Sequence, residues 1–257
     1  MTITSPHNEQ LKEVRKLAGR KWRDKLRLFV AEGEDLIEAA TRAGWAPEAL
    51  YAAEGSGLEG VPVAPHVLAT VSQLGSGTRA LGIYGMRWAS EPTGPVCLAL
   101  WGVNDPGNVG TALRSALAFG AGSVALGPGS ADPYGPKAVR ASMGALFEVP
   151  VARVRDVSEL PGHKIALAPN QGSDLAIAHG PRDPAGPERP GAGLQDLTPL
   201  LGDVTVVVGA EREGLSAKVV AACDEVAHIP IRSESLNAGM AATVALYELD
   251  RRIRGHG

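Results

Sequence analysis

Short runs of apolar residues recur through the second half of the chain, and helix-like stretches or turns separate them. The runs are VCLALWGV, SVALG, VPVARV, KIALAP, VTVVVG and AHIPI. A strand that is apolar along its whole length is typical of a parallel sheet covered by helices on both faces. The sequence therefore predicts an α/β domain built on a parallel sheet.

A stretch rich in turn-forming residues, GMRWASEPTGP at residues 85–95, precedes the first of these runs and indicates a linker. Before it, strand-like and helical stretches alternate on a smaller scale. Because 257 residues are enough for two domains, we predict a small α/β domain over residues 1–90 and a larger one over 91–257. Residues 178–196, which are rich in proline and glycine, are expected to form a mobile surface insertion.

The composition excludes some classes of protein. No apolar run is long enough to span a membrane, and the first residues lack the hydrophobic core of a secretory signal. The two cysteines, Cys97 and Cys223, lie in apolar segments without metal-ligand spacing, so we expect buried thiols in a reducing cytoplasm and no metal. The net charge of −3 argues neither for nor against a nucleic-acid partner.

Positive charge is concentrated near the N-terminus. Between residues 12 and 27, eight Lys and Arg residues face only Glu13 and Asp24. On one continuous helix, five of them would form a single stripe: Lys12, Lys16, Arg20, Arg23 and Arg27. The apolar Leu11, Val14, Leu17 and Ala18 would face the other way. Such a stripe is compatible with an ordinary solvated helix face or with a surface that contacts phosphates.

Three polar clusters follow strands of the predicted parallel sheet. The first is NDPGNVGTALRSA, where Asn104 to Asn108 form a turn and Arg114 lies in the helix that follows, with Asn108 as its expected cap. The second and third are VVVGAEREGLS and IPIRSESLNAGMAA. Ligands bind beyond the carboxyl ends of strands in open parallel sheets, so we expect the three clusters to meet.

Each cluster taken alone also has a purely structural interpretation. Gly107 and Gly110 can simply shape a turn, and Glu211, Ser235 or Asn237 can cap helices. A nicotinamide-dependent enzyme is a rival hypothesis, because GAEREG is a glycine-rich turn after a strand. Neither this turn nor GNVG fits the G-x-G-x-x-G fingerprint, which disfavours that rival.

Taken together, the three clusters resemble the motifs of the SpoU–TrmH family of RNA ribose 2′-O-methyltransferases, and they occur in that family's order. The stretch YGPKAVRASMGALFEVPV between the first two motifs is also similar. The resemblance covers roughly residues 95–252. The first 40 residues look like the small RNA substrate-binding domain that many members carry. The sequence departs from the family in LNAGMAA, where Gly239 is expected to loosen the start of the last helix.

The resemblance implies a SPOUT fold, with a parallel sheet, helices on both faces and a C-terminal trefoil knot. It implies a homodimer that binds S-adenosylmethionine in the knot, with the site near the subunit interface. Carried over position by position, Gly209, Ile229 and Leu236 match residues whose backbone surrounds the cofactor. The polar active-site positions are matched by Asn108, Arg114, Glu211, Ser235 and Asn237.

The expected activity is methylation of a ribose 2′-hydroxyl, in 23S rRNA by resemblance of the N-terminal region, with RNA contacts from Lys12, Lys16, Arg20 and Arg23. Transfer RNA is the alternative substrate, and a non-catalytic RNA-binding relative is the alternative class. The family resemblance assigns Arg114 to promoting deprotonation of the hydroxyl. Because the very high pKa of arginine disfavours a neutral guanidine, we favour a grip on the adjacent phosphate and stabilisation of negative charge. A role as base through a phosphate relay stays open.

Overall fold

The computed structural model describes residues 1–74, 77–169, 171–175, 202–232 and 235–253, and the predicted insertion at 178–196 lies outside them. Packing divides the chain into two compact units, which are Met1–Arg87 with Asp132–Glu148, and Trp88–Ala131 with Val149–Gly257. The domains expected from the sequence, 1–90 and 91–257, differ from this division because residues 132–148 pack within the first unit.

The first unit is built on a sheet in which β4 (Ala80–Gly85) runs antiparallel to β1 (Leu28–Glu32) and β2 (Ala49–Ala53). The short β3 (Val61–Val63) pairs parallel with β2. The accompanying helical elements are α1 (Glu9–Leu17), α2 (Arg20–Leu26), α3 (Glu34–Arg42), α4 (Pro65–Ala69), α6 (Pro136–Ser142) and the 3-10 turn η1 (Ala145–Phe147). Leu11, Val14 and Leu17 of α1 are buried in the core of this unit, as their spacing predicts.

An aromatic cluster explains why residues 132–148 belong to the first unit. The ring of Phe29 in β1 lies 4.9 Å from that of Tyr134 and 5.9 Å from that of Phe147. Trp45 packs edge-on against Phe147, and its indole Nε1 donates a hydrogen bond of 2.8 Å to the Phe147 carbonyl. These contacts join positions about a hundred residues apart in the sequence, so no local pattern could have predicted them.

The basic stretch does not form one helix, so the predicted single stripe is wrong. The helix is interrupted at Ala18 and Gly19. Gly19 has an extended backbone (φ −89°) and directly precedes α2. Arg23 turns inward and is buried. Its Nε and Nη2 bind Asp132 at 3.0 and 2.8 Å, while Nη1 donates to the carbonyls of Leu17 and Ala18. The guanidinium of Arg23 is therefore engaged inside the unit and is not available to contact RNA.

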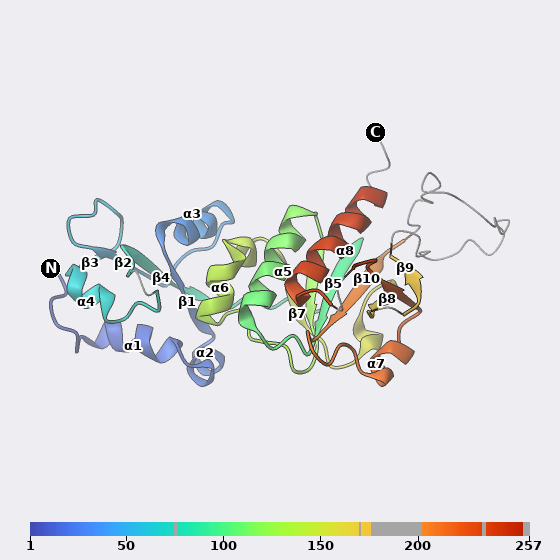
Figure 1. Cartoon of the computed structure of the whole chain (residues 1–257). Coiled ribbons are helices and arrows are strands. Elements are labelled where there is room, and N and C mark those ends of the chain that lie inside the picture. Colours follow the sequence, from blue (N-terminus) through green and yellow to red (C-terminus); the bar gives the residue numbers. More distant parts are fainter. Residues whose placement is uncertain (75–76, 170, 176–201, 233–234, 254–257) are drawn as a thin grey trace. The chain divides into compact units, whose positions relative to one another are not determined.

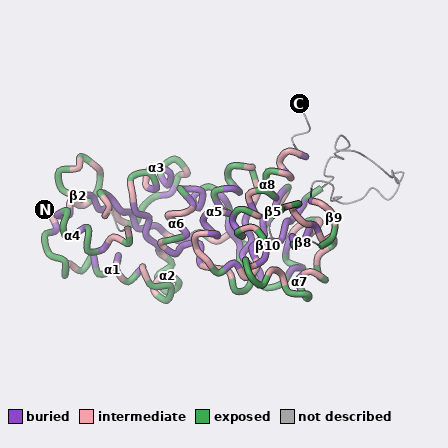
Figure 2. The backbone as a smooth tube through the Cα atoms, in the orientation of Figure 1, coloured by how far each residue is buried: buried purple, intermediate pink, exposed green. Residues whose placement is uncertain are grey.

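The second unit carries the predicted parallel sheet, which is confirmed. Within the described residues the strand order is β7-β6-β5-β10-β8-β11-β9, and every pair is parallel. The strands are β5 (Val96–Trp101), β6 (Ser123–Leu126), β7 (Val151–Arg153), β8 (His163–Leu167), β9 (Ser173–Asp174), β10 (Val204–Gly209) and β11 (Glu225–His228). Figure 2 shows β5 and β10 buried over almost their whole length, which explains their apolar sequences.

Helices cover both faces of this sheet. On one face, η2 (Val157–Glu159) and α7 (Ala217–Ala221) pack on Cys97, Ala99 and Val207. On the other face, α5 (Pro106–Ala118) and α8 (Ala238–Ile253) lie side by side (Figure 1), with α5 against β6 and α8 against β5 and β10. Among the described helices, none has the length and apolar character that crossing a bilayer would require.

Candidate active site

The three polar clusters follow the carboxyl ends of strands in the second unit. The turn that leads into α5 follows β5, residues 210–216 follow β10, and the segment from Ile229 to Asn237 follows β11 and leads into α8. Because all strands of the sheet are parallel, these ends lie at the same edge. The clusters therefore meet at one edge of the sheet, as expected.

One residue from each cluster enters a shared hydrogen-bond network. Asn108, in the first turn of α5, donates from Nδ2 to Glu211 Oε1 over 2.7 Å. Asn237 donates from Nδ2 to Asn108 Oδ1 over 2.8 Å and also to Glu211 Oε1. Asn108 is buried, whereas Glu211 and Asn237 are exposed. The network is therefore buried at Asn108 and accessible to a ligand at Glu211 and Asn237.

The start of α8 fixes the orientation of the two amides. Asn237 Oδ1 accepts hydrogen bonds from the backbone N–H groups of Gly239 and Met240, at 3.0 and 3.2 Å, and so caps the helix. Its Nδ2 must then point away from the helix end, toward Asn108 and Glu211. Since Asn108 Oδ1 receives this amide, its own Nδ2 is directed at the Glu211 carboxylate. One helix cap therefore sets the direction of the whole network.

The helix α5 begins earlier than predicted, because Asp105 caps it and not Asn108. Pro106 occupies the first helical position, which proline favours, and Asp105 Oδ1 accepts from the Asn108 N–H over 3.1 Å. An aspartate immediately before a proline is a recognisable signal of a helix start. Because Asp105 caps the helix, the side chain of Asn108 is free to take part in the network.

Close packing of α5 and α8 holds Asn108 and Asn237 in register. Gly239 is buried against Thr111, and a Cβ built on Gly239 would come within 3.1 Å of Thr111 Cβ. The hydroxyls of Ser115 and Thr243 are 2.6 Å apart, and Thr243 Oγ1 also donates to the Gly239 carbonyl over 2.8 Å. Gly239 therefore allows the two helices to approach each other closely.

The residues assigned to the cofactor lie at the same edge of the sheet. Gly209 ends β10 and is buried, and a Cβ there would overlap the Gly214 carbonyl carbon at 2.4 Å, so the 209–215 loop folds tightly back on itself. Ile229 directly follows β11, and Leu236 precedes Asn237, both half-buried. Backbone amides and carbonyls beside apolar side chains fit a ligand that combines a base, a ribose and an aliphatic chain.

The remaining predicted catalytic residues are exposed. Arg114 lies on α5 about a third of a turn around the helix from Asn108, and it makes no hydrogen bond or ion pair within the described part of the chain. Ser235 is exposed in the segment before α8. The structure therefore brings Asn108, Glu211 and Asn237 together and leaves Arg114 on an open face of α5.

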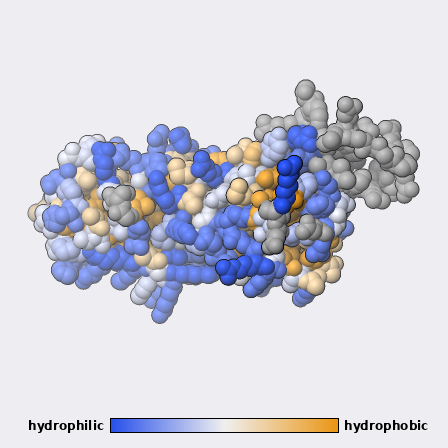
Figure 3. Space-filling model, viewed as in Figure 1, coloured by the Kyte–Doolittle hydropathy of each residue, from blue (hydrophilic) through white to orange (hydrophobic). Residues whose placement is uncertain are grey.

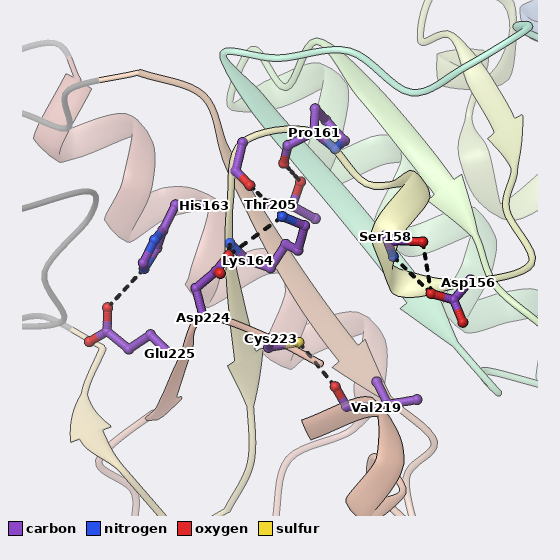
Figure 4. A network of polar contacts seen from close by, with 11 residues as sticks. Asp156, Ser158, Pro161, His163, Lys164, Thr205, Val219, Cys223, Asp224 and Glu225 are labelled. Atoms are coloured by element: carbon purple, nitrogen blue, oxygen red, sulfur yellow. Dashed lines mark hydrogen bonds and ion pairs between the residues drawn. The ribbon is translucent and has the colours of Figure 1, made fainter. Parts of the chain in front are cut away.

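A second polar network lies at the opposite edge, around the amino ends of β8, β10 and β11 (Figure 4). His163 Nε2 is 3.3 Å from Glu225 Oε2, and the Lys164 backbone N–H donates to Asp224 Oδ2 over 2.8 Å. This backbone hydrogen bond lowers the pKa of Asp224. Thr205 Oγ1 donates to the Pro161 carbonyl over 2.6 Å. The bonds of Asp224 and Thr205 satisfy backbone groups at or next to the start of β8, which indicates a structural network.

The two cysteines are structural as well. Cys97 is buried in β5 as expected, whereas Cys223 is only half-buried, and its Sγ contacts the Val219 carbonyl at 3.3 Å. Burial raises the pKa of the Cys97 thiol and raises that of Cys223 to about 11. Across the described residues, no group of three or more His, Cys, Asp or Glu side chains is placed to hold a metal ion.

Two family models match the sequence of this chain. The SpoU rRNA Methylase family model matches residues 95–247, which include all three clusters and the network between them. The chain belongs to the SpoU rRNA methylase family. The MRM3-like substrate binding domain model matches residues 8–75. The predicted family is thereby confirmed, and with it the prediction of an RNA methyltransferase that uses S-adenosylmethionine.

Individual relatives match nearly the whole chain. A 23S rRNA (guanosine(2553)-2′-O)-methyltransferase of Bacillus subtilis is 28% identical over 96% of this chain and 98% of its own length. Mitochondrial rRNA methyltransferase 3 of Mus musculus is 27% identical over 91% of this chain and 70% of its own length. The crystal structure of an AdoMet-bound rRNA methyltransferase from Sinorhizobium meliloti superposes with a TM-score of 0.80 at 27% identity. The superposition covers 98% of this chain and 97% of the Sinorhizobium meliloti chain.

Proposed function

We propose that this chain transfers a methyl group from S-adenosylmethionine to a ribose 2′-hydroxyl of 23S rRNA. The observation that carries the proposal is the network of Asn108, Glu211 and Asn237, which joins one residue from each of the three family motifs at the carboxyl edge of the sheet. A purely structural role for the three residues would explain the cap at Asn237 but not the two side-chain bonds to an exposed carboxylate.

When bound, S-adenosylmethionine would supply an electrophilic methyl group and leave as S-adenosylhomocysteine, while the proton of the 2′-hydroxyl would pass to water. In the proposed site, the backbone at Gly209, Ile229 and Leu236 holds it. Methyl transfer to oxygen also requires the hydroxyl to be aligned and partly freed of its proton. Within the described residues only Oε1 of Glu211 is engaged, so Glu211 Oε2 is available to accept a hydrogen bond from a ribose hydroxyl. Asn108 holds this carboxylate in place, and Ser235 supplies a further hydroxyl beside Asn237.

Arg114 acts on the nucleotide from the open face of α5. A guanidinium there can grip the phosphate next to the target ribose through two parallel hydrogen bonds. Its positive charge stabilises the negative charge that develops on the 2′-oxygen as the proton leaves. This role requires an exposed arginine without a competing carboxylate, and Arg114 has no such partner among the described residues.

The proposed homodimer is supported by an apolar surface on α5 and α8. Met240, Val244 and Tyr247 follow one another at helical spacing on α8 and are 58%, 39% and 52% exposed. Leu117 of α5 is 39% exposed, and Phe119 packs against Tyr247. Figure 3 shows hydrophobic surface over α8. A second copy of this chain on that face would cover it and would bring the subunit interface close to Arg114.

Three finer features complete the proposal. Two relatives act on rRNA by their names, which favours rRNA over tRNA as substrate, and the likeness to the Bacillus subtilis relative favours a cytoplasmic enzyme. We also propose that the C-terminal segment threads into a trefoil knot, as the likeness to the Sinorhizobium meliloti structure supports. A crystal structure that traces the chain through residues 176–201 and 233–234 would test the knot.

The function is tested by incubating purified protein and labelled S-adenosylmethionine with 23S rRNA or tRNA that lacks modifications, followed by mapping of 2′-O-methyl positions. We expect one methylated ribose in 23S rRNA and no requirement for a metal ion beyond folding of the RNA. Methylation of tRNA alone would show that tRNA, and not rRNA, is the substrate. Binding of rRNA without any methyl transfer would favour the non-catalytic alternative.

A further inference from the structure

An indole ring lies among the basic residues of α1 and α2. Trp22, in the first turn of α2, is half-exposed. The Nζ atoms of Lys16 from α1 and Lys25 from α2 each lie 5.3 Å from the centre of its ring. Two ammonium groups from different helices therefore converge on one half-exposed aromatic ring. At this distance, cations are attracted to an aromatic face.

The break at Gly19 creates this arrangement. Because α1 ends and α2 starts in a new direction, Lys16 and Trp22 meet even though they belong to different helices. The surroundings are strongly cationic, since Lys12, Lys16, Arg20, Lys21, Lys25 and Arg27 are all exposed. Asp24 pairs with Arg20 at 3.5 Å, and Glu9 pairs with Lys12. The positive charges still outnumber their acidic partners.

Charge alone can bind an RNA backbone, but a half-exposed indole adds a second kind of contact. Aromatic faces stack on unpaired bases, and a surface that combines such rings with cations is typical of proteins that bind single-stranded nucleic acid. A base paired inside a duplex cannot present its face to the ring. The combination of Trp22, Lys16 and Lys25 therefore fits an unpaired nucleotide better than a helical stem.

We propose that Trp22 stacks on an unpaired base of the substrate RNA while Lys16 and Lys25 bind the flanking phosphates. In the free protein the two ammonium groups lie over the indole ring. When RNA arrives, they move to the phosphates and release the ring for the base. The inference rests on the proposed function, because it requires RNA as the partner, and it adds a residue that selects single-stranded segments.

The test compares affinity for an unpaired RNA oligonucleotide and for an RNA duplex over a range of salt concentrations. Trp22→Leu keeps an apolar side chain but removes the stacking face. It is expected to bind the unpaired RNA about 10-fold more weakly, with unchanged salt dependence and unchanged duplex binding. The double variant Lys16→Gln/Lys25→Gln is expected to weaken both RNAs and to reduce the salt dependence.

A matched control and a spectroscopic measurement complete the design. Trp88 is also half-exposed, with the Arg153 guanidinium 3.9 Å from its ring, and Trp88→Leu is expected to leave RNA affinity unchanged. Unpaired RNA is expected to quench part of the tryptophan emission of the unmodified protein but not of Trp22→Phe, whose phenyl ring preserves stacking and packing. This second measurement decides the matter if Trp22→Leu does not fold.

The outcomes separate the inference from the function beneath it. Equal affinity of Trp22→Leu and the unmodified protein for unpaired RNA, or equal losses for unpaired and duplex RNA, would overturn the stacking role. Identical quenching in Trp22→Phe would do the same. In each of these cases methylation by the unmodified protein would still stand. Failure of the unmodified protein to bind or methylate any RNA would instead overturn the proposed function.

Discussion

Asn237 has two tasks that are usually performed by separate residues. Its Oδ1 caps the start of α8 by accepting hydrogen bonds from the backbone N–H groups of Gly239 and Met240, and its Nδ2 donates to Asn108 and Glu211. An amide is the one neutral side-chain group of this size that can accept at one atom and donate twice at the other. The choice of asparagine at this position follows from the two tasks together.

Two substitutions of Asn237 should separate its tasks. Asn237→Ser keeps a cap but cannot reach Asn108 and Glu211, so we expect a free energy of unfolding close to that of the unmodified protein and a large loss of methyl transfer. Asn237→Ala loses the cap as well and should be less stable by about 1 kcal/mol. Urea unfolding and single-turnover assays measure the two effects. Full activity of Asn237→Ser would contradict a role of the network in catalysis.

Arg114 should behave differently, because its side chain is exposed. Arg114→Ala is expected to change the free energy of unfolding by less than about 0.5 kcal/mol and to leave S-adenosylmethionine binding intact, while methyl transfer falls by orders of magnitude. Arg114→Lys should restore little activity if the two-pronged grip on phosphate matters. Calorimetric titration and transfer assays provide the measurements, and an Arg114→Ala variant with normal turnover would end the catalytic assignment.

At the scale of elements, the helices α1 and α2 contain two kinds of basic residue. Lys12, Lys16 and Arg20 are exposed, whereas Arg23 is buried with Asp132 as its partner. The buried pair ties α2 to the segment that starts at residue 132, and Asp132 Oδ1 also accepts from the Tyr134 N–H over 3.0 Å. Exposed and buried cations in the same run of sequence therefore have opposite sensitivities to substitution.

Replacement of the two kinds of residue should give opposite results. Arg23→Gln leaves the Asp132 carboxylate buried without its charge partner and should cost about 3 kcal/mol of stability. The triple variant Lys12→Gln/Lys16→Gln/Arg20→Gln should keep its stability and lose RNA affinity, with a flatter salt dependence. Thermal melting and salt-dependent RNA binding measure the two. A stable Arg23→Gln variant with weakened RNA binding would instead show that Arg23 contacts RNA.

These elements also show how far sequence patterns reach. The apolar strands and the parallel sheet are predictable, because burial of both faces of a strand requires uninterrupted apolar residues. The three motifs indicate the network at Asn108, Glu211 and Asn237, because strand ends of a parallel sheet share an edge. The break at Gly19 is not predictable from charge spacing, which continues across it. The burial of Arg23 depends on Asp132, and no local pattern relates residues that far apart.

For the whole molecule, the apolar face of α5 and α8 gives the proposed dimer a direct test. Val244→Asp places a charge in the middle of the Met240, Val244 and Tyr247 stripe, which is exposed in a single chain and costs little there. We expect sedimentation to show a monomer, and methyl transfer to fall with it. Leu26→Asp changes an apolar residue of similar exposure in the first unit and should leave the assembly unchanged. A Val244→Asp variant that sediments as a dimer would refute this interface.

The raised pKa values of the two native thiols make the protein a convenient scaffold for chemical labelling. Only the thiolate reacts with maleimides or iodoacetamide, and with a pKa of about 11 the Cys223 thiol is ionised in roughly one molecule in a few thousand at pH 7.5. Cys97 is buried as well. A single cysteine introduced at the exposed Lys21 should therefore react far faster than either native thiol, and a mass spectrum of the alkylated protein would check this. Probes could then be attached beside Trp22 without first removing any residue that holds the sheet together.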